Sequence, residues 1–120
     1  MLSYQHGYHA GNLADVHKHA TLASAIHLLT RKEKPLSYIE THSGRGLYDL
    51  TSEFALKTGE AEAGILSIDS RGWFEASHPY AVARRAVQAA YGESAYPGSP
   101  LIAHMLLRAE DRMHLAELHP

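Results

Sequence analysis

The sequence contains no cysteine, which excludes both a disulfide scaffold and a thiolate metal site. It also lacks an apolar run close to the roughly 20 residues that a membrane-spanning helix needs. The opening MLSYQHGYHAGN has no apolar core segment and therefore differs from a signal peptide. We expect a soluble protein with no membrane partner, and the absence of cysteine suits the reducing cytoplasm.

A strong excess of one charge is also absent, because the formal net charge of the 120 residues is -2 at pH 7. A hydrophobic fraction of 45% and a charged fraction of 20% are typical of a globular domain. The first 34 residues hold more basic than acidic side chains, namely Lys18, Arg31, Lys32 and Lys34 against Asp15 and Glu33, with His6, His9, His17, His19 and His27 beside them. If the protein binds a polyanion, this segment is the better candidate. The alternative is a solvated surface on which these charges cluster by chance.

The first regular element predicted is a helix from Asn12 or Asp15 to about Arg31. Either residue can cap it, and Pro35 prevents its continuation. Its apolar positions recur at helical spacing: Val16, Ala20, Ala23, Ile26 and Leu29.

Two strands are expected, LSYIE at 36–40 and MHLAEL at 113–118. Residues 47–95 are predicted to be mostly helical, in three pieces: one opened by Thr51 or Ser52, one from Thr58 to Ile68, and one from Pro79 to a cap at Gly92. The segment 96–100 is a sharp turn in which Ser99 caps a helix with Pro100 at its first position. The predicted fold is therefore α/β, with a helical subdomain at 48–95 inserted after the first strand. Two strands alone leave an open edge and an uncovered face, so we expect either a truncated domain or a sheet completed by a partner.

The loop ETHSGRG, which follows the first strand, is the strongest local signal of chemistry. An acid at the strand end, Glu40, followed by a glycine turn is typical of nucleotide-cofactor sites, because glycine allows close approach of the backbone to a ligand. The turn has neither the third glycine of the dinucleotide motif nor the Lys-Ser/Thr of a phosphate loop, which argues against NAD and ATP. Glu117, at the end of the second strand, is an acid that could accept the two ribose hydroxyls. An ordinary tight turn and a surface acid are the alternatives.

A metal site and a hydrolase active site have less support in the sequence. The pairs His6 with His9 and His17 with His19 lack the HExxH pattern and receive no help from cysteine, so we expect no metal. Ser43 lies in a glycine turn but without the G-x-S-x-G frame of a hydrolase nucleophile.

Four blocks of the sequence, in order, carry a resemblance. MLSYQHGYHAGNLADVHKH, ETHSGRGLY, YPGSPLIA and ELHP together closely resemble the RlmJ family of bacterial 23S rRNA adenine-N6 methyltransferases. The resemblance implies that residues 1–120 are the N-terminal part of a Rossmann-like domain that binds S-adenosyl-L-methionine, with 23S rRNA as its partner. It implies that His19, His42, Ser99 and Glu117 contact the cofactor, and that Tyr4 contacts the RNA substrate.

The chain departs from the family pattern in several places. Arg45 replaces a small residue between the two glycines, Glu40 stands where aspartate is familiar, and residues 48–95 diverge most. The Asp-Pro-Pro-Tyr motif, which in the family holds the target amine and stacks on the extracted base, does not occur in this sequence. We therefore expect no methyl transfer by this chain alone. The alternative function is a nucleic-acid binding module involved in the use of external DNA, without catalysis, whose salt-dependent binding would weaken when Lys18 and residues 31–34 are replaced.

Overall fold

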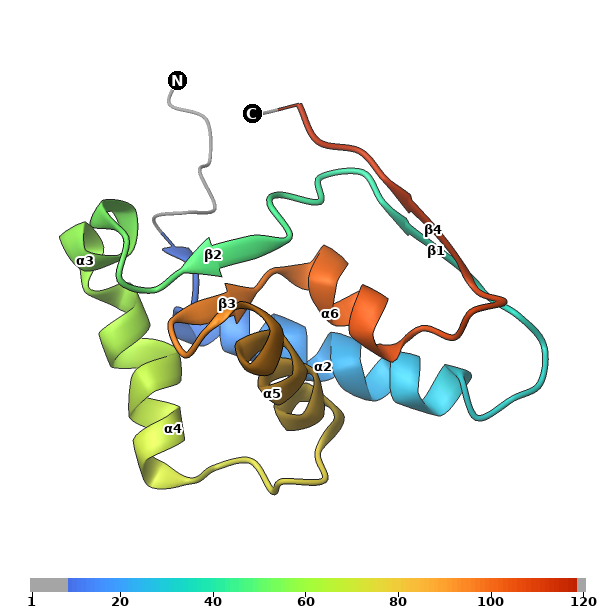
Figure 1. The fold of residues 1–120 in the computed structure, drawn as a ribbon, viewed down its shortest axis with the longest axis horizontal. Coiled ribbons are helices and arrows are strands. Elements are labelled where there is room, and N and C mark those ends of the chain that lie inside the picture. The colour runs from blue at the N-terminus through green and yellow to red at the C-terminus, as the bar shows by residue number, and fades with distance from the viewer. Residues whose placement is uncertain (1–8, 119–120) are drawn as a thin grey trace.

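The computed structural model describes residues 9–118, which form a mixed α/β arrangement (Figure 1). Helix α2 (Leu13–Leu29) is the first long helix of the described residues, and the Asn12 side chain accepts the Asp15 N–H at 2.8 Å, so Asn12 rather than Asp15 is the cap. The helix buries Val16, Ala23 and Ile26 as expected. Leu29, expected on the same apolar face, is 49% exposed. The last turn of α2 extends past α5 (Figure 1).

The two strands predicted from the sequence form one parallel pair. β1 (Ser37–Glu40) and β4 (Arg112–Leu115) run side by side with Ser37 opposite Arg112 and Glu40 opposite Leu115. β4 is shorter than the predicted 113–118 segment. Because the pair is parallel, the carboxyl ends of both strands lie at the same edge.

A second strand pair was not predicted. β2 (Leu47–Asp49) and β3 (Ala95–Pro97) are antiparallel, with Tyr48 opposite Tyr96. The sequence predicted a mostly helical segment at 47–95 and a turn at 96–100, and neither prediction included these strands. Three-residue strands are too short to show an alternating pattern, and each is stabilised by a partner far away in the sequence.

The helices between these strands are short except for one. They are α3 (Glu53–Thr58), the π-helical turn η1 (Glu62–Leu66), α4 (Ser67–Arg71) and α5 (Pro79–Tyr91). The prediction for α5 is confirmed, with Pro79 in its first turn and Gly92 at its end. The single helix expected from Thr58 to Ile68 is broken at Gly64, where the backbone leaves the helical region and the Ile65 N–H donates to the Gly11 carbonyl at 2.8 Å.

Helix α6 (Ser99–Leu106) begins one residue earlier than expected. Gly98 is its cap and Ser99 its first residue, so the predicted capping role of Ser99 was wrong. The Ser99 hydroxyl is engaged elsewhere, as described below.

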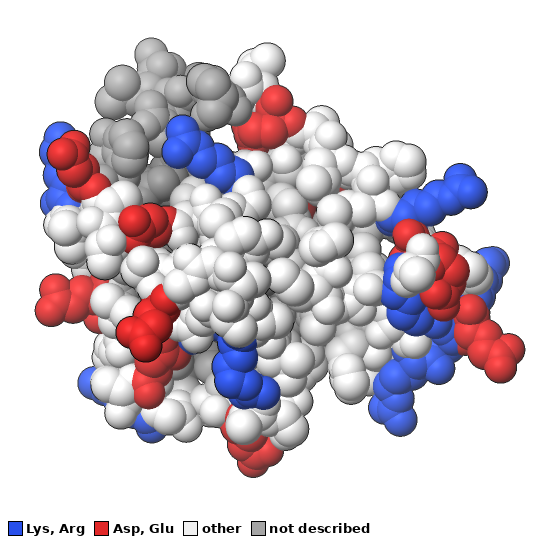
Figure 2. All heavy atoms as spheres, viewed as in Figure 1, with Lys and Arg blue, Asp and Glu red and all other residues white. Residues whose placement is uncertain are grey.

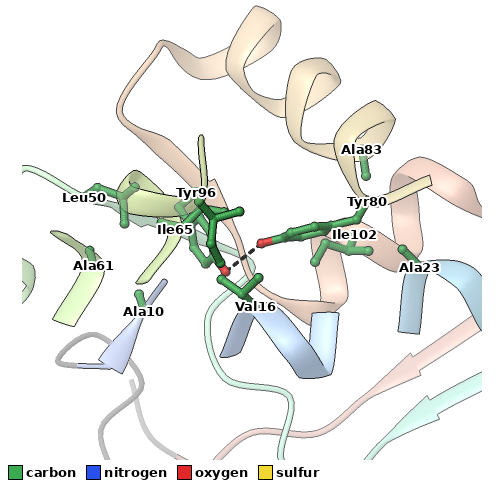
Figure 3. Close-up of a cluster of buried hydrophobic side chains, with 11 residues drawn as sticks. Ala10, Val16, Ala23, Leu50, Ala61, Ile65, Tyr80, Ala83, Tyr96 and Ile102 are labelled. Carbon is green, nitrogen blue, oxygen red and sulfur yellow. Dashed lines mark hydrogen bonds between the residues drawn. The ribbon is translucent and has the colours of Figure 1, made fainter. Parts of the chain in front are cut away.

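The core lies between α2, α5, α6 and β3, which contact one another (Figure 3). Tyr80 and Tyr96 are its largest side chains, and both are fully buried. Their hydroxyls form a 2.9 Å hydrogen bond, so two buried polar atoms satisfy each other. The remaining core is aliphatic, for instance Val16, Ile65 and Ile102. None of the helices in residues 9–118 has the length and apolar character needed to cross a membrane.

Candidate cofactor site

The carboxyl ends of β1 and β4 stay joined beyond the strands. The Ala116 N–H donates to the Glu40 carbonyl at 2.9 Å, and the Ser43 N–H donates to the Ala116 carbonyl at 3.0 Å. The loop after β1 is therefore fixed to the loop after β4. In α/β folds, ligands bind in the crevice outside such strand ends.

Glu117 holds the glycine turn in place. Its carboxylate accepts the Gly44 N–H and also its neighbour's N–H, that of Leu118, at 3.1 Å. Gly44 has a φ of 67°, a left-handed conformation that L side chains rarely adopt, which explains the glycine at this position. The acid predicted from the end of the second strand and the glycine predicted from the first turn are thus direct partners.

Ser99 is bonded to the acid at the end of β1. Its hydroxyl donates to one Glu40 oxygen at 2.6 Å, and the Tyr38 hydroxyl donates to the other at 2.7 Å. Burial, together with this hydrogen bond to the carboxylate, raises the pKa of Tyr38 well above its ordinary value. The first turn of α6, which carries positive partial charge, lies beside Glu40.

The glycine turn after β1 and the Pro-Gly-Ser-Pro turn before α6 meet closely beside the hydrogen bond from Ser99 to Glu40. The Gly98 N–H donates to the Gly46 carbonyl at 2.8 Å. A Cβ atom at Gly98 would lie 2.3 Å from the Arg45 carbonyl oxygen, so only glycine fits. The Tyr48 hydroxyl accepts the Arg45 N–H at 3.0 Å, and burial raises the pKa of Tyr48 to about 12. The Pro-Gly-Ser-Pro turn and the glycine turn are therefore one packed unit.

His19 lies in the interior and is only 2% exposed. Its Nδ1 is 3.3 Å from the Tyr96 hydroxyl, and its Nε2 is 3.3 Å from an Asp15 carboxylate oxygen. Asp15 also accepts the Gly11 N–H at 2.9 Å. The imidazole is thus oriented by partners at both ring nitrogens.

The structure brings some of the predicted residues together and not others. His19 and Ser99 line one small pocket, together with Ala10, Asp15, Lys18, Ser43, Tyr48 and Gly98. The enclosed space is about 10 Å³, roughly that of one water molecule, so these side chains contact one another rather than surround a ligand-sized cavity. Glu117 and His42 are exposed at the strand ends, and His42 Nδ1 is 3.0 Å from the Thr41 hydroxyl. Tyr4 lies outside the described residues.

Sequence reasoning missed three residues of this pocket as site residues: Asp15, Ser43 and Tyr48. The four-residue spacing of Asp15 and His19 on a predicted helix could have indicated the first, because such positions share a helix face. No local signal could have indicated Tyr48, which the unpredicted β2–β3 pair brings here. No group of three or more metal-ligating side chains occurs within residues 9–118.

Comparison with known proteins places this chain in a family. The family model described as ribosomal RNA large subunit methyltransferase D, RlmJ, matches residues 33–120. The chain is 44% identical to ribosomal RNA large subunit methyltransferase J of Escherichia coli K12 and 46% identical to that of Haemophilus influenzae Rd, over its whole length and 43% of each relative. The crystal structure of protein LPL1258 from Legionella pneumophila matches with a TM-score of 0.76 and 41% identity, covering 93% of this chain and 41% of that one. The chain spans less than half the length of these relatives, and it belongs to the RlmJ family of ribosomal RNA large subunit methyltransferases.

Proposed function

We propose that residues 1–120 form the part of an rRNA adenine-N6 methyltransferase that binds the methyl donor, S-adenosyl-L-methionine. The observation that carries the proposal is the junction of Glu117 with the Gly44 turn at the carboxyl ends of two parallel strands. Membership of a family of ribosomal RNA methyltransferases gives this junction its chemical context.

The proposal includes a Rossmann-like domain of which these residues are the N-terminal part. The parallel β1–β4 pair exposes large apolar side chains, with Ile39 68% and Leu115 44% exposed. Relatives more than twice as long have further chain with which to cover such a surface. Residues 48–95 would be a helical subdomain inserted after the first strand. The β2–β3 pair supports this, because it brings the two ends of that segment together.

The residues at the strand ends fit the chemistry of the cofactor. Ribose hydroxyls are donors that need an acceptor, and the exposed Glu117 carboxylate is one. An ionised carboxylate offers about four acceptor positions, so holding backbone N–H groups does not by itself exhaust it. The imidazoles of His19 and His42 and the hydroxyl of Ser99 are the other proposed contacts, of which His19 and Ser99 are already oriented by Asp15 and Glu40.

The bound cofactor supplies a methyl group on a sulfonium that an amine can attack in line. The contribution of this chain is to bind and orient that group, which is the main demand of such a transfer. The sequence has no Asp-Pro-Pro-Tyr motif to hold an adenine amine, so we propose that it does not transfer methyl groups alone. The partner is 23S rRNA in the cytoplasm, approached by the N-terminal segment that includes Tyr4.

A chimera tests the reaction. Residues 1–120 are joined to the part of the Escherichia coli relative that follows its matching region, and labelled S-adenosylmethionine is offered with unmethylated 23S rRNA. We expect label in N6-methyladenosine after nucleoside digestion, and none with residues 1–120 alone. A folded chimera that labels another nucleoside would overturn the adenine-N6 assignment. Nucleic-acid binding without any cofactor binding would favour the non-catalytic alternative.

A further inference from the structure

A second pocket lies between α4 and α5, away from the strand ends. Its volume is about 190 Å³, more than ten times the roughly 10–15 Å³ that one water needs. Its walls include three aromatic and three charged side chains: Asp69, Trp73, Phe74, Tyr80, Arg84 and Arg85. The connection from α4 to α5 contributes Gly72, Trp73 and Phe74 to its lining.

The aromatic wall presents an exposed ring. Gly72 ends α4 in a left-handed conformation with φ of 62°, which turns the chain out of the helix directly before Trp73. Trp73 is 64% exposed, although it is the residue with the largest apolar surface in the chain. Phe74 packs edge-on against Tyr80 with their ring centroids 5.3 Å apart. Trp73 therefore offers an exposed aromatic surface at a pocket whose inner wall is formed by the packed rings of Phe74 and Tyr80.

The polar wall contains a buried donor without an acceptor. Arg84 is only 8% exposed, and it pairs through both terminal nitrogens with the Asp69 carboxylate, one of them at 2.9 Å. Its Nε–H has no hydrogen-bond partner within the described part of the chain. The Arg84 guanidinium carbon also lies 5.9 Å from the centroid of the Tyr80 ring and 5.9 Å from that of Tyr96, so this cation belongs to the inner wall. Exposed Arg85 adds a second cation, so two arginines face one aspartate.

We propose that this pocket binds one nucleotide of single-stranded RNA, with its base stacked on Trp73 and a phosphate near Arg85. A flat ring and a negative charge in one ligand describe a nucleotide, and unpaired RNA bases are recognised by stacking on aromatic rings. The choice of RNA over other nucleotide ligands rests on the proposed function. The pocket would add a contact to the substrate on the helical segment.

Fluorescence gives a direct test, because Trp73 is the only tryptophan in the sequence. Single-stranded A6 and U6 RNA are titrated into the protein at low salt, and at least one is expected to quench the Trp73 emission. Duplex RNA of the same length is expected not to do so. Failure of both single-stranded hexamers to quench would overturn the proposal, as would equal quenching by adenosine monophosphate at the same concentration.

Fluorescence polarisation of a labelled single-stranded RNA hexamer measures how substitutions in the protein change its affinity for the RNA. Trp73→Leu should weaken binding about 5- to 150-fold, the effect of losing one base stack, and it should leave the fold intact since the side chain is largely exposed. Arg85→Ala should weaken binding more than Arg112→Ala, a matched loss of an exposed cation outside the pocket. Equal affinities of Trp73→Leu and wild type, or equal effects of the two arginine variants, would overturn the proposal.

Calorimetry with S-adenosylhomocysteine on the same samples separates this proposal from the proposed function. Hexamer quenching without S-adenosylhomocysteine binding would leave the pocket intact and remove the cofactor assignment. S-adenosylhomocysteine binding without quenching of the Trp73 emission would keep the cofactor assignment and remove the pocket proposal. Trp73→Leu is expected to bind S-adenosylhomocysteine as the wild type does.

Discussion

Replacing Gly98 with alanine tests how tightly the two turns of the candidate site are packed. Gly98 has an ordinary φ of -78°, which alanine adopts freely, so the substitution adds only a methyl group. That methyl carbon would lie 2.3 Å from the Arg45 carbonyl oxygen and 3.0 Å from the Tyr48 ring. The nearer atom belongs to the backbone, so the turn must move, and the 2.8 Å bond from Gly98 to the Gly46 carbonyl is strained or lost.

Overpacking of this kind costs about 1–3 kcal/mol. For a chain of this size, a loss of about 2 kcal/mol lowers the melting temperature by roughly 6–12 °C. Thermal unfolding followed by circular dichroism measures the change. Gly46→Ala is the matched control, because a Cβ there meets only the Leu101 Cβ at an ordinary 3.9 Å and Gly46 has no positive φ.

We expect the control to stay within about 0.5 kcal/mol of the wild type, as substitutions away from packed features do. Equal stabilities of the Gly98 and Gly46 variants would refute the reasoning, since the close approach of the two turns would then carry no cost.

Two further predictions concern titratable groups. Hydrogen bonds from Arg108 and from the Leu36 N–H hold the pKa of Asp111 well below its ordinary value. Its stabilising contribution is therefore complete above the unfolded pKa of about 3.9 and is lost as the pH falls. The melting temperatures of the wild type and Asp111→Asn should converge between about pH 5 and pH 2, and a gap independent of pH would contradict this. Tyr80→Phe should cost about 1 kcal/mol in urea unfolding through loss of the bond to Tyr96, and unchanged stability would contradict that. Burial raises the pKa of Tyr80 to about 12, so its contribution persists below about pH 10 and is lost as the pH rises through 12.

Local signals predicted the helices with distinct ends. Asn12 caps α2, while Pro79 and Gly92 mark the ends of α5, because these residues satisfy or terminate helix hydrogen bonds whatever the rest of the fold does. The break at Gly64 was not predictable, since it depends on the close approach of the Gly11 carbonyl from another segment.

The strands likewise include one that the local sequence predicts and two that depend on pairing with a distant segment. The run at 36–40 was long and apolar enough to be predicted, whereas β2 and β3 exist through their mutual pairing and contain three residues each. Without that pairing, neither the position of Tyr48 nor the contact between the two turns could be inferred. The basic residues Arg31, Lys32 and Lys34 belong to a candidate polyanion surface, yet at this end of the molecule Lys and Arg side chains lie among Asp and Glu (Figure 2). Arg108 also donates to the carbonyls of Lys32 and Lys34.

The sequence predicted individual residues of the candidate site but not the contacts between them. Glu117 and the glycine turn were each recognised from the end of a strand, but their direct bond requires β1 and β4 to be parallel neighbours. Likewise, the burial of His19 and its contact with Tyr96 depend on packing across 77 residues of sequence.

Calorimetric titration with S-adenosylhomocysteine tests the central claim most directly. We predict that the wild type binds it and that Glu117→Gln, which keeps an acceptor oxygen for the Gly44 N–H but loses the charge, binds roughly 10- to 150-fold more weakly, the effect of losing a charged hydrogen bond worth about 1.5–3 kcal/mol. Glu110→Gln, a matched exposed acid at the other end of β4, should bind as the wild type does. Equal affinities of the wild type and Glu117→Gln, or no binding by either, would contradict the account.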